Sequence, residues 1–144
     1  MMRSVVDTNV LITFFWEKSV ARQLFYNNKL SLVSPEYALE EINKYQTEVC
    51  KKAQISSKQF EQLKIELAKI IEFAPLNQYS NLLKQALNIS PDSNDVDFIA
   101  LAIKENCALW TNDKKLSEQN AVIVLSTEEL IECLTDIEQT EKIN

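Results

Sequence analysis

Short apolar runs of four or five residues alternate along this chain with longer amphipathic stretches. The runs have the length and the β-branched content typical of strands. They lie at residues 3–7, 29–33, 72–75, 107–110 and 121–125. Between them, apolar residues recur every three to four positions, as they do in helices packed along one side. This order of strands and helices predicts an α/β domain with a mainly parallel sheet.

The amphipathic stretches predict seven helical segments, of which the first divides at Ser19. They lie at residues 10–26, 36–50, 57–71, 79–87, 95–104, 115–119 and 127–134. Pro35 stands where the first turn of a helix favours proline, so residues 36–50 are expected to form one long helix. Ser126 is expected to cap the last helix.

The length suits a single domain. A chain of 144 residues with 46% hydrophobic content can bury one core but is short for two. Residues 1–135 are expected to form the domain, and the polar residues 136–144 a frayed tail. Because no apolar run approaches the roughly 20 residues that cross a bilayer, we expect a cytoplasmic protein with no membrane contact.

The composition excludes several kinds of chemistry. The chain has no histidine, which removes histidine acid–base catalysis and leaves its three cysteines without partners for a zinc site. It has no glycine, which removes the phosphate-binding loops of dinucleotide and P-loop folds. The net charge of −6 gives no overall attraction for nucleic acid. Carboxylates that bind a divalent cation would offset this charge locally.

Two aspartates stand where predicted strands end, and a third lies on an apolar helix face. Asp7 ends the first strand, and Asp113 follows the strand at residues 107–110. Ligands of open parallel sheets bind outside the carboxyl ends of strands, so this pair is a candidate site, although a lone aspartate there is more often a turn residue. Asp95 shares the apolar stripe of Phe98 and therefore needs a partner.

Helix geometry distinguishes acids that are close in sequence. Glu41 lies about 60° from the edge of its helix's apolar stripe and Glu40 about 160° away, so Glu41 is expected to be half-buried and Glu40 solvated. By the same rule Asp97 is expected to be exposed. Asp92 is most economically an N-cap whose partner at the third helical position is Asp95, with a second metal or water contact as the functional alternative.

Four segments together resemble the motifs of the PIN-domain nucleases, in that family's order. They are Val5-Val6-Asp7-Thr8-Asn9-Val10-Leu11-Ile12, Ser34-Pro35 with Glu40-Glu41-Ile42, Asp92-x-x-Asp95-x-x-Phe98-Ile99-Ala100-Leu101-Ala102, and Trp110-Thr111-Asn112-Asp113-Lys114-Lys115-Leu116. The glutamate segment is weak alone, and the others are specific. The resemblance extends from the start of the chain to about Leu125. It implies a three-layer α/β/α fold around a sheet of four to five strands.

The resemblance also implies a site and an activity, namely hydrolysis of RNA by an endoribonuclease that binds Mg²⁺ or Mn²⁺. The implied metal ligands and catalytic residues are Asp7, Glu41, Asp95 and Asp113, with Asn9, Thr111 and Asp92 as supporting residues. Such cations prefer oxygen ligands and activate bound water, so no histidine is needed. Many small members of the family are toxins, so an antitoxin partner is implied, and a homodimer is common in the family.

Other interpretations stay open on the sequence alone. A catalytically silent PIN-like domain would act as a binding or scaffold module. A phosphatase of the haloacid-dehalogenase type also has an acid after its first strand, but it needs a second aspartate where this chain has Asn9. The helix at residues 57–71 has more apolar surface than a lid over a small sheet requires. This surplus suggests self-association, unless the stripe packs on the domain's own core.

Overall fold

The structure, a computed structural model that describes residues 1–143, is built around a parallel sheet. Its strands are β1 (Met2–Val6), β2 (Leu30–Pro35), β3 (Glu72–Ala74), β4 (Ala108–Trp110) and β5 (Val124–Leu125). They follow the order β3-β2-β1-β4-β5, and each neighbouring pair is parallel. The predicted α/β fold with a mainly parallel sheet of four to five strands is confirmed.

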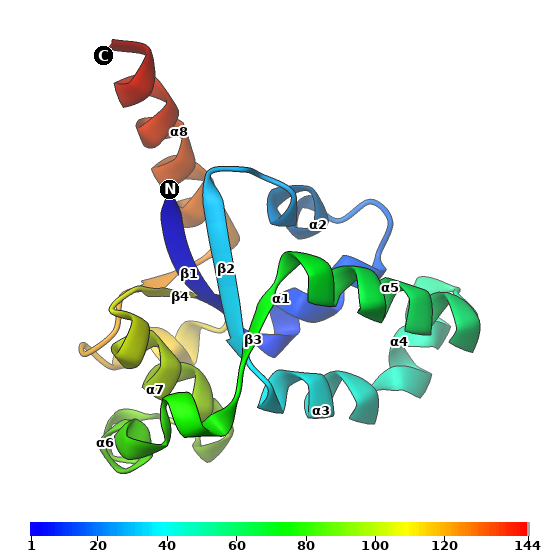
Figure 1. Cartoon of the computed structure of the whole chain (residues 1–144), viewed down its shortest axis with the longest axis horizontal. Helices are drawn as coiled ribbons and strands as arrows, with labels where there is room; N and C mark the ends of the chain where they lie inside the picture. The colour runs from blue at the N-terminus through cyan, green and yellow to red at the C-terminus, as the bar shows by residue number, and fades with distance from the viewer. Residues whose placement is uncertain (144) are drawn as a thin grey trace.

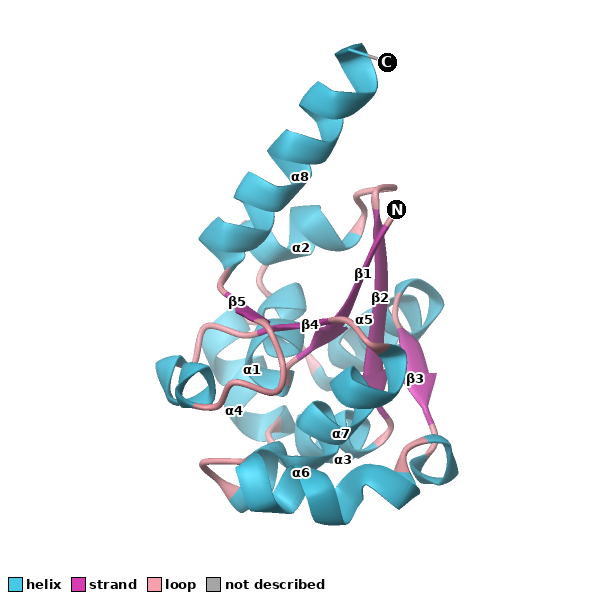
Figure 2. Ribbon diagram, turned by 90° about the vertical axis from the view of Figure 1, so that its left-hand side faces the viewer, coloured by secondary structure: helices cyan, strands magenta, loops and turns pink. Residues whose placement is uncertain are grey.

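Helices cover both faces of the sheet and complete three layers (Figure 1, Figure 2). One face carries α6 (Leu83–Ile89) and α7 (Val96–Glu105), and α7 packs along β1, β2 and β4. The other face carries α1 (Thr8–Ile12), the 3-10 turn η1 (Thr13–Phe15), α2 (Val20–Phe25) and α5 (Ser57–Ile70). The helices α3 (Tyr37–Lys44) and α4 (Gln46–Ala53) follow the carboxyl end of β2.

Short 3-10 turns connect several of these elements. They are η2 (Leu76–Gln78), η3 (Ser80–Leu82), η4 (Ser93–Asp95) and η5 (Lys114–Glu118). The last helix, α8 (Thr127–Ile143), extends beyond the end of the sheet at which the chain begins (Figure 1). The carboxyl ends of the strands, where a site is expected, therefore lie away from the C-terminal end of α8.

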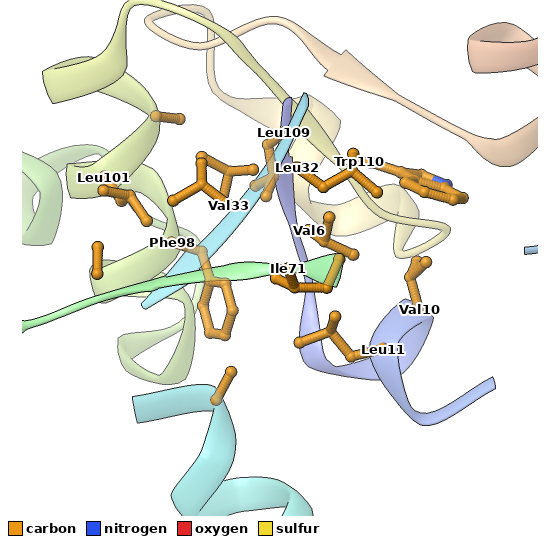
Figure 3. Close-up of a cluster of buried hydrophobic side chains, with 14 of the residues drawn as sticks. Val6, Val10, Leu11, Leu32, Val33, Ile71, Phe98, Leu101, Leu109 and Trp110 are labelled. Atoms are coloured by element: carbon orange, nitrogen blue, oxygen red, sulfur yellow. The ribbon is translucent and has the colours of Figure 1, made fainter. Parts of the chain in front are cut away.

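The core lies on both sides of the central strand β1. Figure 3 shows Phe98 and Leu101 of α7 on one side of the strands and Leu11 of α1 on the other. All three side chains are fully buried, or nearly so. A serine in this core, Ser34, donates its hydroxyl to the carbonyl of Val6 at 2.9 Å, so its burial leaves no unpaired polar group. This packing fixes the position of the sheet edge at which the candidate acids lie.

Several helix boundaries differ from those expected from the sequence, and two of the differences are large. The single helix predicted over residues 36–50 is divided at Tyr45, whose φ is −96° and ψ 11°. The last helix was predicted to end at residue 134 and instead continues to Ile143, so the described part of the expected frayed tail is helical. The tail has no proline or glycine that would end a helix, and polar composition alone does not end one. Asn144 lies outside the described residues.

The apolar stripe of α5 packs on the domain's own core. Phe60 and Leu67 are fully buried, and the ring of Phe60 stacks on that of Phe15 with centroids 4.7 Å apart. Leu63 and Ile70 are half-buried against the same core. The surplus apolar surface that suggested self-association is therefore used inside this chain.

Two further features concern the chain as a whole. The three cysteines, Cys50, Cys107 and Cys133, are free thiols. Among residues 1–143, none of the helices combines the length and the apolar character needed to cross a bilayer.

Candidate metal-binding active site

Asp7 leaves the carboxyl end of β1, the central strand of the sheet. Its backbone N–H donates to the carbonyl of Trp110 at 3.0 Å, which extends the β1–β4 pairing by one residue. Its own carbonyl accepts from the N–H groups of Val10 and Leu11 and so begins α1. The residue is only 6% exposed. The junction of strand and helix thus holds a buried carboxyl group at the edge of the sheet.

Thr111 connects Asp7 to the loop that carries Asp113. The Thr111 hydroxyl donates to Oδ2 of Asp7 at 2.6 Å and accepts from the backbone N–H of Asp113 at 3.1 Å. Thr111 is buried, and its own N–H donates to the carbonyl of Leu125 at 3.0 Å. The Thr111 hydroxyl thus uses its proton for Asp7 and a lone pair for the N–H of Asp113. Thr111 therefore holds the two aspartates near one another.

Glu41 reaches the same edge from α3. The hydroxyl of Thr8, which is buried at the start of α1, donates to Oε1 of Glu41 at 2.6 Å. Glu41 is half-buried and Glu40 is exposed, so the face predicted from helix geometry is confirmed. Thr8 was not singled out as a supporting residue, although it lies within the Asp-Thr-Asn segment. The contact that gives Thr8 its role comes from a helix 33 residues away.

Asp95 is the N-cap residue of α7, yet its side chain makes no cap hydrogen bond. That role belongs to Asp92, which caps η4 by accepting from the N–H of Asn94 at 2.9 Å. Asp92 is exposed and Asp95 half-buried. The capping expected of Asp92 is confirmed, although it acts on the 3-10 turn that precedes α7. The carboxylate of Asp95 is therefore not used by its own helix.

These acids are close enough to change one another's ionisation. Burial, followed by the charges of Asp7, Asp92, Asp113 and Glu41, raises the pKa of Asp95 to about 6. Burial also raises the pKa of Asp7 and of Glu41, and the hydroxyls of Thr111 and Thr8 partly oppose these shifts. Each neighbour disfavours the charged form of the others unless a proton or a cation lies among them. We name these four acids, Asp7, Glu41, Asp95 and Asp113, the acid cluster.

The donor set of the acid cluster fits a hard divalent cation. Its ligands are all oxygens, as Mg²⁺ and Mn²⁺ prefer. Among residues 1–143, no three acidic or cysteine side chains are grouped tightly enough to hold an ion as they stand. Mg²⁺ usually keeps several waters and takes only a few carboxylates directly, so acids at wider separations suit an ion bound partly through water. Asp7, Glu41, Asp95 and Asp113 are the residues that would hold it.

Asn9, which was predicted as a supporting residue, lies at the first turn of α1 with an exposed side chain. It lines two cavities together with Ile12 and Trp16. The structure thus places Asn9 at the rim of the site, next to the surface that leads away from it.

Asp97 was predicted to be solvated, and this prediction was wrong. The hydroxyl of Tyr79 donates to Oδ2 of Asp97 at 2.6 Å, and Asp97 is half-buried. Its charge contributes to the raised pKa of Glu41. The helical-face argument considered only the side of α7 that packs on the sheet. A second side is covered by η3 and α6, which the spacing within α7 does not reveal.

The chain belongs to the PIN-domain family, because the family model described as PIN domain matches residues 5–143. Its fold is similar to a chain in the crystal structure of VapBC2 from Rickettsia felis bound to a DNA fragment from their promoter. That match has 18% identity and a TM-score of 0.60, and it covers 87% of this chain and 98% of the other.

A second solved structure has a similar fold. A chain of a toxin–antitoxin complex from Klebsiella pneumoniae matches with 16% identity and a TM-score of 0.58, over 83% of this chain and 95% of that one. At these identities the likeness concerns the fold alone. Comparison with curated proteins gives no significant match.

Proposed function

We propose that this PIN-domain protein is an endoribonuclease that uses Mg²⁺ or Mn²⁺ bound by the acid cluster. The observation that carries the proposal is the convergence of four carboxylates from separate elements at the carboxyl edge of the sheet. Their proximity, together with burial, raises the pKa of Asp95 to about 6. A cluster of like charges in a partly buried site is costly without a cation, so the arrangement is better explained by metal binding than by stability.

Different residues of the chain would have different roles in this reaction. When bound, the divalent ion would supply an activated water and offset the negative charge that grows on the phosphate. Thr111 and Thr8 hold the carboxylates of Asp7 and Glu41 in place through hydrogen bonds of 2.6 Å. The carboxylate of Asp95, which makes no cap hydrogen bond to its own helix, would be available as an oxygen ligand of the ion.

We further propose that the protein acts in the cytoplasm as the toxin of a toxin–antitoxin pair. Support comes from the two solved structures of similar fold, which are VapBC2 bound to a promoter DNA fragment and a toxin–antitoxin complex. The partner would then be an antitoxin protein, and the substrate an RNA. The main argument for self-association no longer applies, because the apolar stripe of α5 packs on the core of the same chain.

The competing proposal is a PIN domain that binds RNA or protein without cleaving it. The hydroxyl bonds to Asp7 and Glu41 favour the enzyme, because they orient carboxylates that a scaffold would not need to hold in a cluster. Membership in the PIN-domain family leaves the phosphatase alternative without support.

Cleavage of a labelled single-stranded RNA tests the proposal. We expect cleavage with Mg²⁺ or Mn²⁺, none with EDTA, and a loss of at least about 100-fold in Asp7→Asn, since metal-assisted activation is the main source of rate. The matched control is Glu40→Gln, which removes a charge from an exposed position next to Glu41 and should cleave normally. A folded protein that cleaves no RNA with either ion would support the scaffold instead.

A further inference from the structure

A groove runs along the α1–η1 segment, which begins at the residue after Asp7, and borders α4 on one side and residues 17–19 on the other. Two cavities with volumes of about 200 and 630 Å³ share Asn9, Ile12 and Trp16 as lining residues. Tyr45 and Lys52 also line the smaller cavity, and Lys18 the larger one. We name the surface formed by these six residues the aromatic groove.

Helical spacing connects the aromatic groove to the acid cluster. Thr8 and Ile12 are four residues apart within α1, and Trp16 follows η1 with an extended backbone. Glu41 and Tyr45 have the same interval at the end of α3. Residues four apart share one face of a helix. Because Thr8 donates to Glu41 at 2.6 Å, the two series meet at the acid cluster and continue from it as the two sides of the groove.

The break between α3 and α4 gives the groove an exposed aromatic ring. Tyr45 stands at the break, with φ −96° and ψ 11°, and is 39% exposed. The ammonium group of Lys44 lies 5.9 Å from the centroid of the Tyr45 ring. Trp16, on the opposite side, is half-buried against the core. Two aromatic side chains, Trp16 and Tyr45, thus line the smaller cavity.

We propose that the aromatic groove binds unpaired bases of the RNA strand whose scissile phosphate lies at the acid cluster. This inference rests on the proposed nuclease function. Aromatic side chains stack on the faces of any base, which gives binding that tolerates different sequences. The amide of Asn9 can pair with a base edge, and Lys18 and Lys52 supply positive charge at the rim.

The charge of the molecule favours base stacking over a phosphate track. The net charge is −6, and Glu17 and Glu48 line the same cavities as Lys18 and Lys52. A backbone-binding surface would need an excess of basic residues. Base stacking needs no excess of basic residues, so it can provide affinity for RNA that the negative net charge of this chain does not provide. It also selects single-stranded RNA, because bases within a duplex are stacked on one another and unavailable.

Tryptophan fluorescence offers a direct test. The chain has two tryptophans, and Trp110 is fully buried with its indole N–H bonded to Thr127 at 3.0 Å. Quenching by a stacked base therefore reports on Trp16. We expect a short oligouridylate in EDTA to quench emission saturably, and an abasic oligonucleotide of the same length and charge to quench little. Trp16→Phe should abolish the response.

A second set of variants tests the other side of the groove. Tyr45→Ala should weaken oligouridylate binding about 10-fold, and Tyr45→Phe should restore it, because stacking needs only the ring. Tyr26→Ala is the matched control, since Tyr26 is 53% exposed and lies outside both cavities. It should bind like the unmodified chain.

The outcomes separate the groove from the nuclease proposal, because quenching in EDTA does not depend on cleavage. Quenching that Tyr45→Ala weakens supports the groove even if no metal-dependent cleavage is found, and that result would reject the nuclease alone. Equal quenching by the abasic oligonucleotide, or none by oligouridylate, would overturn the inference. In that case a protein segment becomes the better candidate for the groove.

Discussion

Two threonine hydroxyls orient the carboxylates of Asp7, which follows β1, and of Glu41 in α3. Thr111 and Thr8 are buried, and each donates at 2.6 Å to one oxygen of Asp7 or Glu41. Hydrogen bonds to a carboxylate favour its charged form, whereas burial disfavours it. Burial is the larger influence, since the pKa of both acids is raised. The acids are thus held in position, but their negative charge is only partly compensated until a cation binds.

Glu41 and Glu40 provide a paired test at this scale. Glu41→Gln should weaken Mn²⁺ binding by about 10-fold or more, as loss of a ligand or of its support does in metal sites. Glu40→Gln should have little effect, because its side chain is exposed on the far side of α3. Isothermal titration with Mn²⁺ measures both. Equal losses in the two variants would show that Glu41 does not have the role we give it.

Asp95 makes stability depend on pH. Its pKa is about 6 in the folded protein against an ordinary value of 3.8, so the folded state binds more protons between these values. The free energy of unfolding of the metal-free protein should therefore fall as pH rises from about 4 to about 6. Raised pKa values of Asp7 and Glu41 act in the same direction.

Urea unfolding at several pH values in EDTA measures this slope. Asp95→Asn should flatten it, because the amide does not titrate in this range. A slope unchanged by the substitution would show that the groups responsible lie elsewhere in the chain.

Residue positions could be predicted where a single element determines them. The end of β1 and the angles around α3 were enough to place Asp7 at the edge of the sheet and to predict that Glu41 is half-buried and Glu40 exposed. Thr8 and the pairing of Tyr79 with Asp97 could not be found this way. Each depends on how two segments remote in sequence pack together, which the periodicity of a single helix does not contain.

Two helices end with left-handed residues although the chain has no glycine. Gln54, which follows α4, has φ 57°, and Asn106, which follows α7, has φ 49°. This conformation costs most residues about 1–2 kcal/mol, whereas asparagine tolerates it through local hydrogen bonds. The cost at Gln54 should therefore be larger than the cost at Asn106.

Glycine substitutions test this ranking. Gln54→Gly should raise the free energy of unfolding by about 1 kcal/mol, and Asn106→Gly should raise it less. Chemical denaturation in the absence of metal is the measurement, and activity should not change because Gln54 lies outside the acid cluster. A gain at Asn106 that exceeds the gain at Gln54 would contradict the argument.

The break at Tyr45 shows the limit of periodicity at the scale of elements. Ala38, Ile42 and Val49 are all buried, so their spacing fits one long helix as well as two short ones. The break lets α4 turn toward α5, against which it packs. The position of α5 in the folded chain decides between one long helix and two short ones. That position cannot be predicted from the sequence of residues 36–50.

Thr127, the first residue of α8, fastens the loop that carries Asp113. Its hydroxyl accepts from the indole N–H of Trp110 at 3.0 Å and from the amide of Asn112 at 3.1 Å. Its backbone N–H donates to Oδ1 of Asn112 at 2.9 Å. Three hydrogen bonds thus connect α8 to the last residue of β4 and to the segment that follows it.

Thr127→Val should lower the free energy of unfolding by about 1–3 kcal/mol, because the buried indole N–H loses its acceptor. It should also weaken Mn²⁺ binding, since the loop of Asp113 is less constrained, and Thr127→Ser should restore both. Thr135→Val, which removes an exposed hydroxyl from the same helix, is the control and should change little. Normal metal binding in a destabilised Thr127→Val would limit Thr127 to a structural role.

At the scale of the whole molecule, the sheet brings together acids that are far apart in sequence. Residues 7, 41, 95 and 113 meet because parallel strands end at one edge and β1 lies at the centre of the sheet. The alternation of strands and helices was enough to predict the class of fold. The order β3-β2-β1-β4-β5 could not be predicted from it, because several orders satisfy the same alternation.

Metal binding should therefore stabilise the whole fold. An ion that binds only the folded state at 100 times its dissociation constant contributes about 2.7 kcal/mol, which is a rise of roughly 5–10 °C in thermal midpoint for a domain of this size. In Asp95→Asn part of the repulsion is relieved, so this variant should be at least as stable as the unmodified chain in EDTA and gain less from Mg²⁺ or Mn²⁺. Asp136→Asn, at an exposed position of α8, should gain as much as the unmodified chain. Calorimetry with and without the ions distinguishes these cases, and an Asp95→Asn protein clearly less stable in EDTA would mean that Asp95 serves the fold rather than the metal.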